Sequence, residues 1–188
     1  MPAIIAGKLP PGGRIVEIGS GNGILLSYLA ASGFQSVMGV EPSPPPQGNG
    51  PTVLAGRAEA LPLPDACCDA AVMECVFSLC EAEPSVRELS RVLVPGGIAV
   101  IADLFSGSGG TVLHRSPMVR RVLPPDELCV CFHRYFDLQS FEDHTAELRN
   151  LFLQTLFQGN AQRFWDPSEM EELKKAKAGY GIWIWKKH

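Results

Sequence analysis

The sequence has no excess of basic residues: 16 Lys and Arg stand against 20 Asp and Glu, which gives a formal net charge of −4. Proteins that bind nucleic-acid backbones need a basic patch, so nucleic acid is not an expected partner. The longest apolar runs, such as Ile98 to Ala102, are of strand length and far shorter than the about 20 residues that cross a bilayer. The chain opens without a signal-peptide pattern. We therefore expect a cytoplasmic protein that does not enter a membrane.

The composition is that of a folded globular protein. Hydrophobic residues make up 46% of the chain and charged residues 19%, which excludes the polar, highly charged composition of disorder. The 188 residues suit one domain, residues 1–188. Because no secretory signal precedes them, the six cysteines are expected to be reduced thiols rather than a disulfide framework.

Apolar runs of strand length alternate with segments of helical period along the chain. The prolines and glycines between Pro42 and Gly50 exclude a helix there. The expected elements are a strand at Arg14 to Ile18, a helix at Gly23 to Ser32, strands at Ser36 to Glu41, Thr52 to Ala55 and Asp69 to Glu74, a helix at Pro84 to Leu93, a strand at Gly97 to Asp103, a short helix near Asp126, a strand near Tyr135 to Phe141, a helix at Asp143 to Phe157 and a strand at Tyr180 to Lys186. The alternation predicts an α/β fold with a largely parallel sheet.

The last expected strand has a period of two, because Ile182 and Ile184 alternate with Trp183 and Trp185. Successive side chains of a strand point to opposite faces, so the tryptophans should share one face and the isoleucines the other. The pattern indicates a strand covered by helices on both sides rather than an aromatic binding surface.

A glycine-rich loop joins the first strand to the first long helix, in the segment Val16 to Gly23 (VEIGSGNG). Small residues at such a turn let the backbone approach a ligand, and the amides of the helix start point at it. Glu41 ends the second strand about 20 residues later, where a carboxylate can accept hydrogen bonds from ribose hydroxyls. Loop and acid together predict a nucleoside ligand.

The glycine spacing distinguishes between nucleoside ligands. A dinucleotide fingerprint needs Gly or Ala three residues after its second glycine, and Ile24 holds that position after Gly21. The additional glycine, Gly23, falls one residue too early. The spacing therefore disfavours a pyrophosphate-containing nicotinamide or flavin cofactor.

Four blocks in order resemble the class I S-adenosylmethionine-dependent methyltransferases, in particular the small-molecule branch with the quinone-biosynthesis and arsenite enzymes. The blocks are Val16 to Gly23, Gly39 to Ser43, Ala58 to Asp65 leading into Asp69 to Val72, and Glu88 to Gly97. The resemblance is close from Arg14 to Asp103 and looser beyond. It implies a Rossmann-like, doubly wound sheet of seven strands, mostly parallel with an antiparallel last strand. It also implies S-adenosyl-L-methionine as the cofactor and a small molecule as the methyl acceptor.

The resemblance assigns roles to residues around the loop. Gly19, Ser20, Gly21 and Gly23 would border the methionine part of the cofactor, and Glu17 would contact its ammonium group. The remaining implied positions are Glu41 and Pro42 at the ribose, Arg57, Ala58 and Glu59 beside the adenine, and Glu74, Cys75 and Val76 at the sulfonium.

The sequence differs from the family pattern in two respects, and both favour an alternative function. Relatives often carry an acid where Arg57 stands, and an arginine cannot accept a hydrogen bond from the adenine amine. The first expected strand begins at Arg14, so no helix is expected to precede it and cover the site. A cofactor-binding protein without catalysis is therefore the alternative to an active enzyme.

No fixed catalytic group is expected, because methyl transfer needs alignment and a base only when the nucleophile carries a proton. Asp103, His114 and His144 are the candidate catalytic residues. A purely structural role, such as capping a helix, would also account for each of them. The helix at Asp143 to Phe157 fits a substrate lid, core packing or a homodimer contact.

The cysteines raise a third alternative, thiol-dependent chemistry of the arsenite type. Cys75 ends a strand that faces the expected site, and Cys80, Cys129 and Cys131 follow it. Soft thiolates can hold arsenic or zinc. The spacings at Cys67 and Cys68 and at Cys129 and Cys131 are not those of a structural zinc site, so no metal is expected.

Overall fold

The computed structural model describes residues 1–46, 48–113, 120–150 and 167–188. The helices are α1 (Pro2–Ala6), α2 (Ile24–Ala31), the short 3-10 helix η1 (Phe77–Leu79), α3 (Ala82–Val92), α4 (Pro125–Phe132) and α6 (Pro167–Lys175), and residues 145–150 are also helical. The strands are β1 (Arg14–Ile18), β2 (Ser36–Glu41), β3 (Thr52–Ala55), β4 (Cys68–Glu74), β5 (Leu93–Phe105), β6 (Val112–Leu113), β7 (Arg121–Val122), β8 (Phe136–Asp143) and β9 (Gly179–Lys187).

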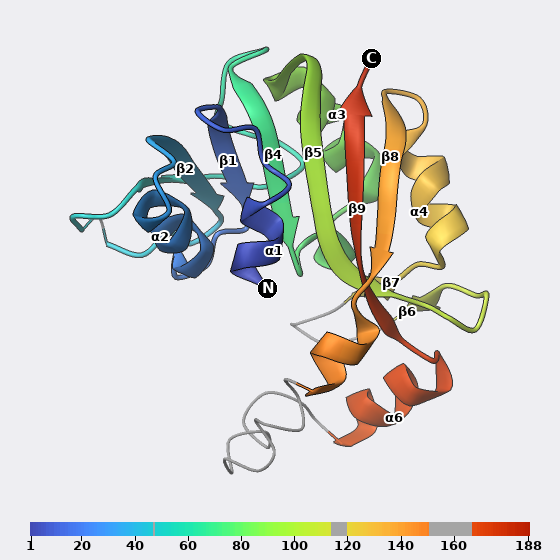
Figure 1. The fold of residues 1–188 in the computed structure, drawn as a ribbon. Coiled ribbons are helices and arrows are strands. Elements are labelled where there is room, and N and C mark those ends of the chain that lie inside the picture. Colours follow the sequence, from blue (N-terminus) through green and yellow to red (C-terminus); the bar gives the residue numbers. More distant parts are fainter. Residues whose placement is uncertain (47, 114–119, 151–166) are drawn as a thin grey trace.

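Seven strands form one sheet in the order β3-β2-β1-β4-β5-β9-β8, and β6 and β7 form a separate hairpin (Figure 1). The five strands from β3 to β5 pair in parallel, whereas β9 pairs antiparallel with both β5 and β8. The chain order reverses between β1 and β4, where the carboxyl ends of these central strands lie side by side. In open α/β sheets such a reversal leaves a crevice that accepts ligands.

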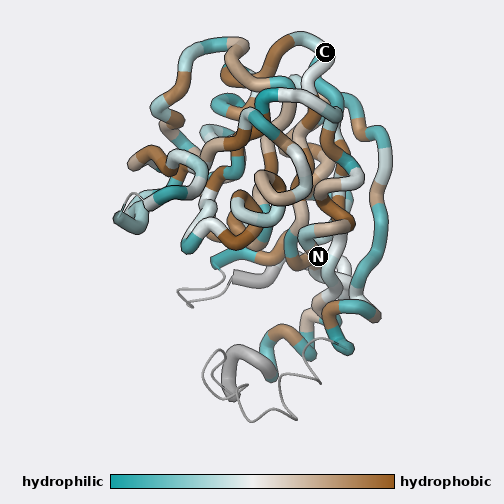
Figure 2. Tube along the Cα trace, turned by 60° about the vertical axis from the view of Figure 1, so that its left-hand side comes forward, coloured by the Kyte–Doolittle hydropathy of each residue, from teal (hydrophilic) through white to brown (hydrophobic). Residues whose placement is uncertain are grey.

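Helices cover both faces of the sheet, with α1 and α2 on one face and α3 and α4 on the other (Figure 1). Trp183 and Trp185 point into the core beneath α3 and α4, where the Trp185 ring stacks on Phe132 at a centroid distance of 4.6 Å. Ile182 and Ile184 pack on the opposite face. The predicted two-sided burial of this strand is confirmed. Figure 2 shows the hydrophobic segments running through the middle of the molecule.

The structure confirms the predicted fold class and corrects several boundaries. A helix does precede the first strand, because α1, with five residues, packs Ile5 into the core. The expectation that no helix precedes this strand and covers the site is wrong only in that respect, since no residue of α1 lines the cavity at the carboxyl ends of the central strands. The helix α3 begins two residues before the expected Pro84, since proline is tolerated in a first turn. The expected helix from Asp143 to Phe157 is helical over residues 145–150, and its later residues lie outside the described part. The sequence analysis did not predict α6.

Within the described residues, no helix combines the length and the apolar character that crossing a bilayer requires.

Candidate active site

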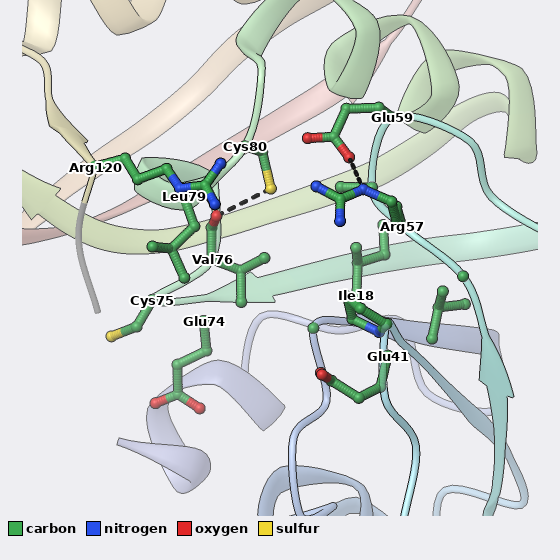
Figure 3. Close-up of a pocket in the computed structure, with 15 residues that line it drawn as sticks. Ile18, Glu41, Arg57, Glu59, Glu74, Cys75, Val76, Leu79, Cys80 and Arg120 are labelled. Atoms are coloured by element: carbon green, nitrogen blue, oxygen red, sulfur yellow. Dashed lines mark hydrogen bonds and ion pairs between the residues drawn. The ribbon is translucent and has the colours of Figure 1, made fainter. Parts of the chain in front are cut away.

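A cavity of about 360 Å³ opens at the carboxyl ends of β1, β2 and β4 (Figure 3). Most of the predicted cofactor-binding residues line it: Gly19, Glu41, Pro42, Arg57, Ala58, Glu59, Glu74, Cys75 and Val76. The other four do not line it: Glu17 and Ser20 are buried, Gly21 is exposed, and Gly23 borders a second cavity of about 210 Å³. The structure therefore brings together residues that the sequence separates by up to about 60 positions.

Six further residues line the cavity without having been predicted: Ile18, Val40, Gly56, Leu79, Cys80 and Arg120. Ile18, Val40 and Gly56 lie at or just past the carboxyl ends of β1, β2 and β3, and this position was the signal that could have identified them. No local pattern marks Arg120, which reaches the cavity from the start of β7.

The glycine loop is held against β2 by backbone hydrogen bonds. The Gly19 amide donates to the Val40 carbonyl at 2.7 Å, and Gly19 has a φ of +73° in the left-handed region. A Cβ at Gly19 would lie 2.7 Å from Cγ1 of Val76 and closer still to its Cγ2. Gly21 is also left-handed, with a φ of +51°, but a Cβ there would meet open space. Gly19 is thus required by packing as well as by its backbone, whereas Gly21 is exposed and is required by its left-handed backbone alone.

Glu41 is tied to the glycine loop, because its Oε2 accepts a hydrogen bond from the Gly21 amide at 3.0 Å. The contact joins the two features that the sequence analysis linked to one nucleoside. It fixes the carboxylate at the mouth of the cavity, where its other oxygen has no partner among the described residues.

Glu17 is a buried carboxylate below the loop, with only 4% of its surface exposed, and its Oε2 has no hydrogen-bond partner among the described residues. Burial raises the pKa of Glu17 to about 8, and the nearby carboxylates of Glu74 and Glu41 add to the effect. Burial also raises the pKa of Glu74. The N-terminal ammonium group opposes the shift at Glu74. Three acids therefore converge on this end of the cavity, and the raised pKa of Glu17 means that its carboxyl holds a proton near neutral pH in the free protein.

On the opposite side of the cavity, charges are paired. The Arg57 guanidinium forms an ion pair with Glu59 at 3.5 Å, drawn in Figure 3. Glu59 also accepts a hydrogen bond from the Glu81 amide at 3.1 Å. Relatives often carry an acid where Arg57 stands. Here the Glu59 carboxylate provides an acceptor oxygen close to that position.

Cys75 follows the end of β4 with a φ of +55°, which is uncommon for a residue with a side chain. Although part of its surface faces the open cavity, surrounding protein atoms desolvate the thiol and raise the pKa of Cys75 to about 12, with Asp103 and Glu74 adding to the shift. Its Sγ lies 3.9 Å from the Tyr180 hydroxyl. At neutral pH this cysteine is therefore a neutral thiol and a poor nucleophile.

Of the three candidate catalytic residues, the two that the structure describes, Asp103 and His144, do not line the cavity. Asp103 is 1% exposed, and its carboxylate accepts hydrogen bonds from the Ser78 and Leu104 amides at 2.8 and 2.7 Å. Burial raises the pKa of Asp103 to about 6, and these amide bonds oppose the shift. His144 lies 3.3 Å from Glu142 through Nε2, in a network that includes Lys8. His114 lies outside the described residues. Asp103 acts as a support for η1 in this arrangement.

The cysteines do not converge. Cys67 and Cys68 lie with their sulfurs 3.5 Å apart, but Cys68 is at the amino end of β4, away from the cavity. Over residues 1–46, 48–113, 120–150 and 167–188, no three His, Cys, Asp or Glu side chains are grouped as metal ligands.

Comparisons with known proteins agree with this geometry. Residues 16–101 match the family model described as a methyltransferase domain. No curated protein sequence matches the chain.

Several solved structures share the fold. The 4+2 cyclase SpnF superposes with a TM-score of 0.81 at 20% identity, over 99% of this chain and 80% of that one. A geranyl diphosphate C-methyltransferase from Streptomyces coelicolor A3(2), solved with Mg²⁺, geranyl diphosphate and S-adenosyl-L-homocysteine, has a TM-score of 0.81 at 13% identity, over 100% of this chain and 76% of that one. A geranyl diphosphate methyltransferase in complex with SAM has a TM-score of 0.79 at 16% identity, over 100% and 84% of the two chains. At these identities the likeness shows a common fold.

Proposed function

We propose that the chain is an S-adenosylmethionine-dependent methyltransferase that transfers the methyl group of S-adenosyl-L-methionine to a small organic molecule. The match of residues 16–101 to a methyltransferase domain and the fold shared with solved methyltransferases support the proposal. The acidic cavity carries this proposal. The cofactor contains a sulfonium and an ammonium group, and an opposite charge stabilises an ionised carboxylate. The buried Glu17, whose Oε2 has no hydrogen-bond partner among the described residues, lies beside Glu41 and Glu74 and fits a ligand of that charge.

The family resemblance gives the assignment of the other cofactor contacts, and the cavity lining supports it. We assign the ribose hydroxyls to Glu41 and Pro42, the adenine to Arg57, Ala58 and Glu59, and the sulfonium to Glu74, Cys75 and Val76. The loop residues Gly19, Ser20, Gly21 and Gly23 border the methionine part. The Ser20 hydroxyl is buried and has no hydrogen-bond partner among the described residues, and a Cβ on Gly39 would lie 2.5 Å from it, so this glycine makes room for the loop.

When held beside Glu17, Glu41 and Glu74, S-adenosyl-L-methionine would supply a methyl group activated by positive sulfur for transfer to the acceptor's nucleophile, with S-adenosyl-L-homocysteine as the leaving group. The chain's own residues align the two reactants and exclude water, and a base is needed only where the nucleophile carries a proton. Asp103 holds η1 in place from outside the cavity, so its contribution is to position Leu79 and Cys80.

An alternative is a protein that binds the cofactor without transferring its methyl group. The observation in its favour is that SpnF, one of the structures that share the fold, is described as a cyclase. Thiol-dependent chemistry of the arsenite type has less support, because the Cys75 and Cys80 thiols both have pKa values raised to about 12 by burial.

Titration calorimetry with S-adenosyl-L-methionine and S-adenosyl-L-homocysteine tests the proposal. We expect both to bind, and Glu41→Ala to weaken binding by about 1.5 to 3 kcal/mol, the range for hydrogen bonds to a charged group. Glu83→Ala, which removes an exposed acid from α3, is the matched control and should bind like the parent. If neither compound binds the parent at millimolar concentration, the proposed function is wrong. If the parent binds and Glu41→Ala binds equally well, the assignment of Glu41 to the ribose is wrong. Formation of S-adenosyl-L-homocysteine with a panel of small acceptors then separates catalysis from binding alone.

A separate prediction concerns Cys75. Because its thiol is protonated at neutral pH, Cys75→Ser is expected to keep the affinity for S-adenosyl-L-methionine within about threefold of the parent. The purified protein should carry neither zinc nor arsenite in stoichiometric amount, which elemental analysis measures. Stoichiometric metal, or arsenite binding that disappears in Cys75→Ser, would instead support thiol-dependent chemistry.

A further inference from the structure

Arg120 is the cavity-lining cation that lacks an ion pair within the described part of the chain. It lies on the Leu79 and Cys80 side of the cavity, across from Glu41 and Glu74 (Figure 3). The other arginine of the cavity, Arg57, is neutralised by Glu59. An arginine that faces a ligand cavity with its charge uncompensated is suited to an anionic ligand group.

The backbone fixes this arginine in place. The Arg120 amide donates to the Ser78 carbonyl at 3.2 Å, and Nη2 of Arg121 lies 3.5 Å from the Cys80 carbonyl. The next residue, Val122, is fully buried, and the Ser106 amide donates to the Leu123 carbonyl at 2.9 Å. The hairpin strand is therefore anchored to η1 and β5, which positions the Arg120 side chain at the wall of the cavity.

The neighbouring lining residues are Val76, Leu79 and Cys80. Among the described residues that line the cavity, the carboxylate nearest to Cys80 is that of Glu59, which is paired with Arg57. Burial raises the pKa of the Cys80 thiol to about 12, and its Sγ contacts the Val76 carbonyl at 3.1 Å, so it is neutral and already engaged. The wall thus combines apolar surface with one guanidinium.

The charges of the cavity are consequently divided between its two sides. The acids Glu17, Glu41 and Glu74 gather at the glycine loop, where the cationic part of the cofactor is assigned. Arg120 stands on the other side, where it is exposed and open to an anionic ligand group. The methionine part of the cofactor, with its carboxylate, is assigned to the glycine loop, so an acidic group of a second ligand fits Arg120 better.

We propose that Arg120 binds the acidic group of the methyl acceptor, and that the acceptor is a small organic anion with an apolar body and a carboxylate or phosphate group. The inference rests on the proposed function. A guanidinium matches both groups with two parallel hydrogen bonds, and Val76 and Leu79 offer apolar surface to the body of the acceptor. Arg120 would therefore determine specificity rather than take part in bond breaking.

The test measures binding to the protein saturated with S-adenosyl-L-homocysteine. Phenyl phosphate and benzoate are titrated as anionic probes, and benzyl alcohol and benzamide as neutral probes of similar shape. We expect at least one anion to bind about 10- to 100-fold more tightly than its neutral counterpart, and Arg120→Gln to remove that preference. Arg120→Lys should retain part of it, because the charge remains but the planar fork is lost. The two anions distinguish carboxylate from phosphate recognition.

Controls separate this inference from the proposed function. Arg134→Gln removes an exposed arginine that stacks on Tyr135 at 5.4 Å, and it should leave both affinities unchanged. Arg120→Gln should leave the affinity for S-adenosyl-L-homocysteine within about twofold of the parent. The inference is overturned if no anion binds the saturated parent or if Arg120→Gln binds the anions as tightly as the parent does. It is also overturned if Arg120→Gln loses as much affinity for S-adenosyl-L-homocysteine as it loses for the anions. In the last case Arg120 serves the cofactor's own carboxylate. Failure of the parent to bind S-adenosyl-L-homocysteine refutes the proposed function instead.

Discussion

Gly19→Ala is expected to abolish cofactor binding and to destabilise the fold by about 2 to 5 kcal/mol. Two costs add at this position. A residue with a Cβ in the left-handed region costs about 1 to 2 kcal/mol, and Gly19 has a φ of +73°. The new Cβ would also overlap the Val76 side chain, and such overpacking typically costs about 1 to 3 kcal/mol. Because Val76 lines the cavity, any movement that relieves the overlap also displaces the cofactor side of the site.

A matched variant separates strain from overlap. Gly109 has a φ of +82°, and a Cβ there would meet nothing within 4 Å, so Gly109→Ala carries the backbone strain alone. We expect it to lose about 1 to 2 kcal/mol of stability in urea unfolding and to bind S-adenosyl-L-methionine normally. The double variant with Gly19→Ala and Val76→Ala should recover part of the lost stability. If Gly19→Ala is no less stable than Gly109→Ala, the overlap with Val76 is not the cause.

Glu17→Gln is expected to change stability and binding in opposite directions. Burial first, then the charges of Glu74 and Glu41, raise the pKa of Glu17 to about 8 in the folded protein, from an ordinary value of about 4.3. The unfolded chain therefore loses this proton at lower pH than the folded chain. The stability that the protonated carboxyl provides is complete below about pH 4 and is lost as the pH rises to about 8. A glutamine stays neutral throughout, so the variant should be about 2 to 4 kcal/mol more stable than the parent at pH 9 and little different at pH 4.

Cofactor binding should respond in the other direction. The cationic cofactor favours the ionised form of Glu17, so at pH 7 its binding should release up to about one proton from the parent. Calorimetry in two buffers of different ionisation enthalpy measures this release. We expect Glu17→Gln to release less and to bind about 10- to 100-fold more weakly. A variant that gains no stability at pH 9 and binds with unchanged affinity would contradict the assignment of Glu17 to the cofactor's cationic end.

The sequence predicted those parts of the site that depend on neighbours along the chain. The turn at Gly19 and Gly21 needs left-handed backbone, and the two residues lie directly between a buried strand and a helix. Glu41 was identified because its strand follows the loop at a characteristic separation. The alternation of Trp183 with Ile182 predicted a strand that is buried on both faces, since successive side chains of a strand point to opposite faces. Each of these features involves residues that lie within about 25 consecutive positions of the sequence.

Only the tertiary structure decided the properties that depend on distant residues meeting. Arg120 joins the cavity because the hairpin bonds to η1, about 40 positions earlier in the chain, and no local period marks such a contact. Asp103 had the residue type of a catalytic acid, but two amides hold it outside the cavity. The raised pKa of Glu17 requires its burial and the approach of Glu74 and Glu41 from two other strands. The physical reason is the same in each case, because desolvation and charge proximity depend on distance in space, and the order of residues alone does not fix that distance.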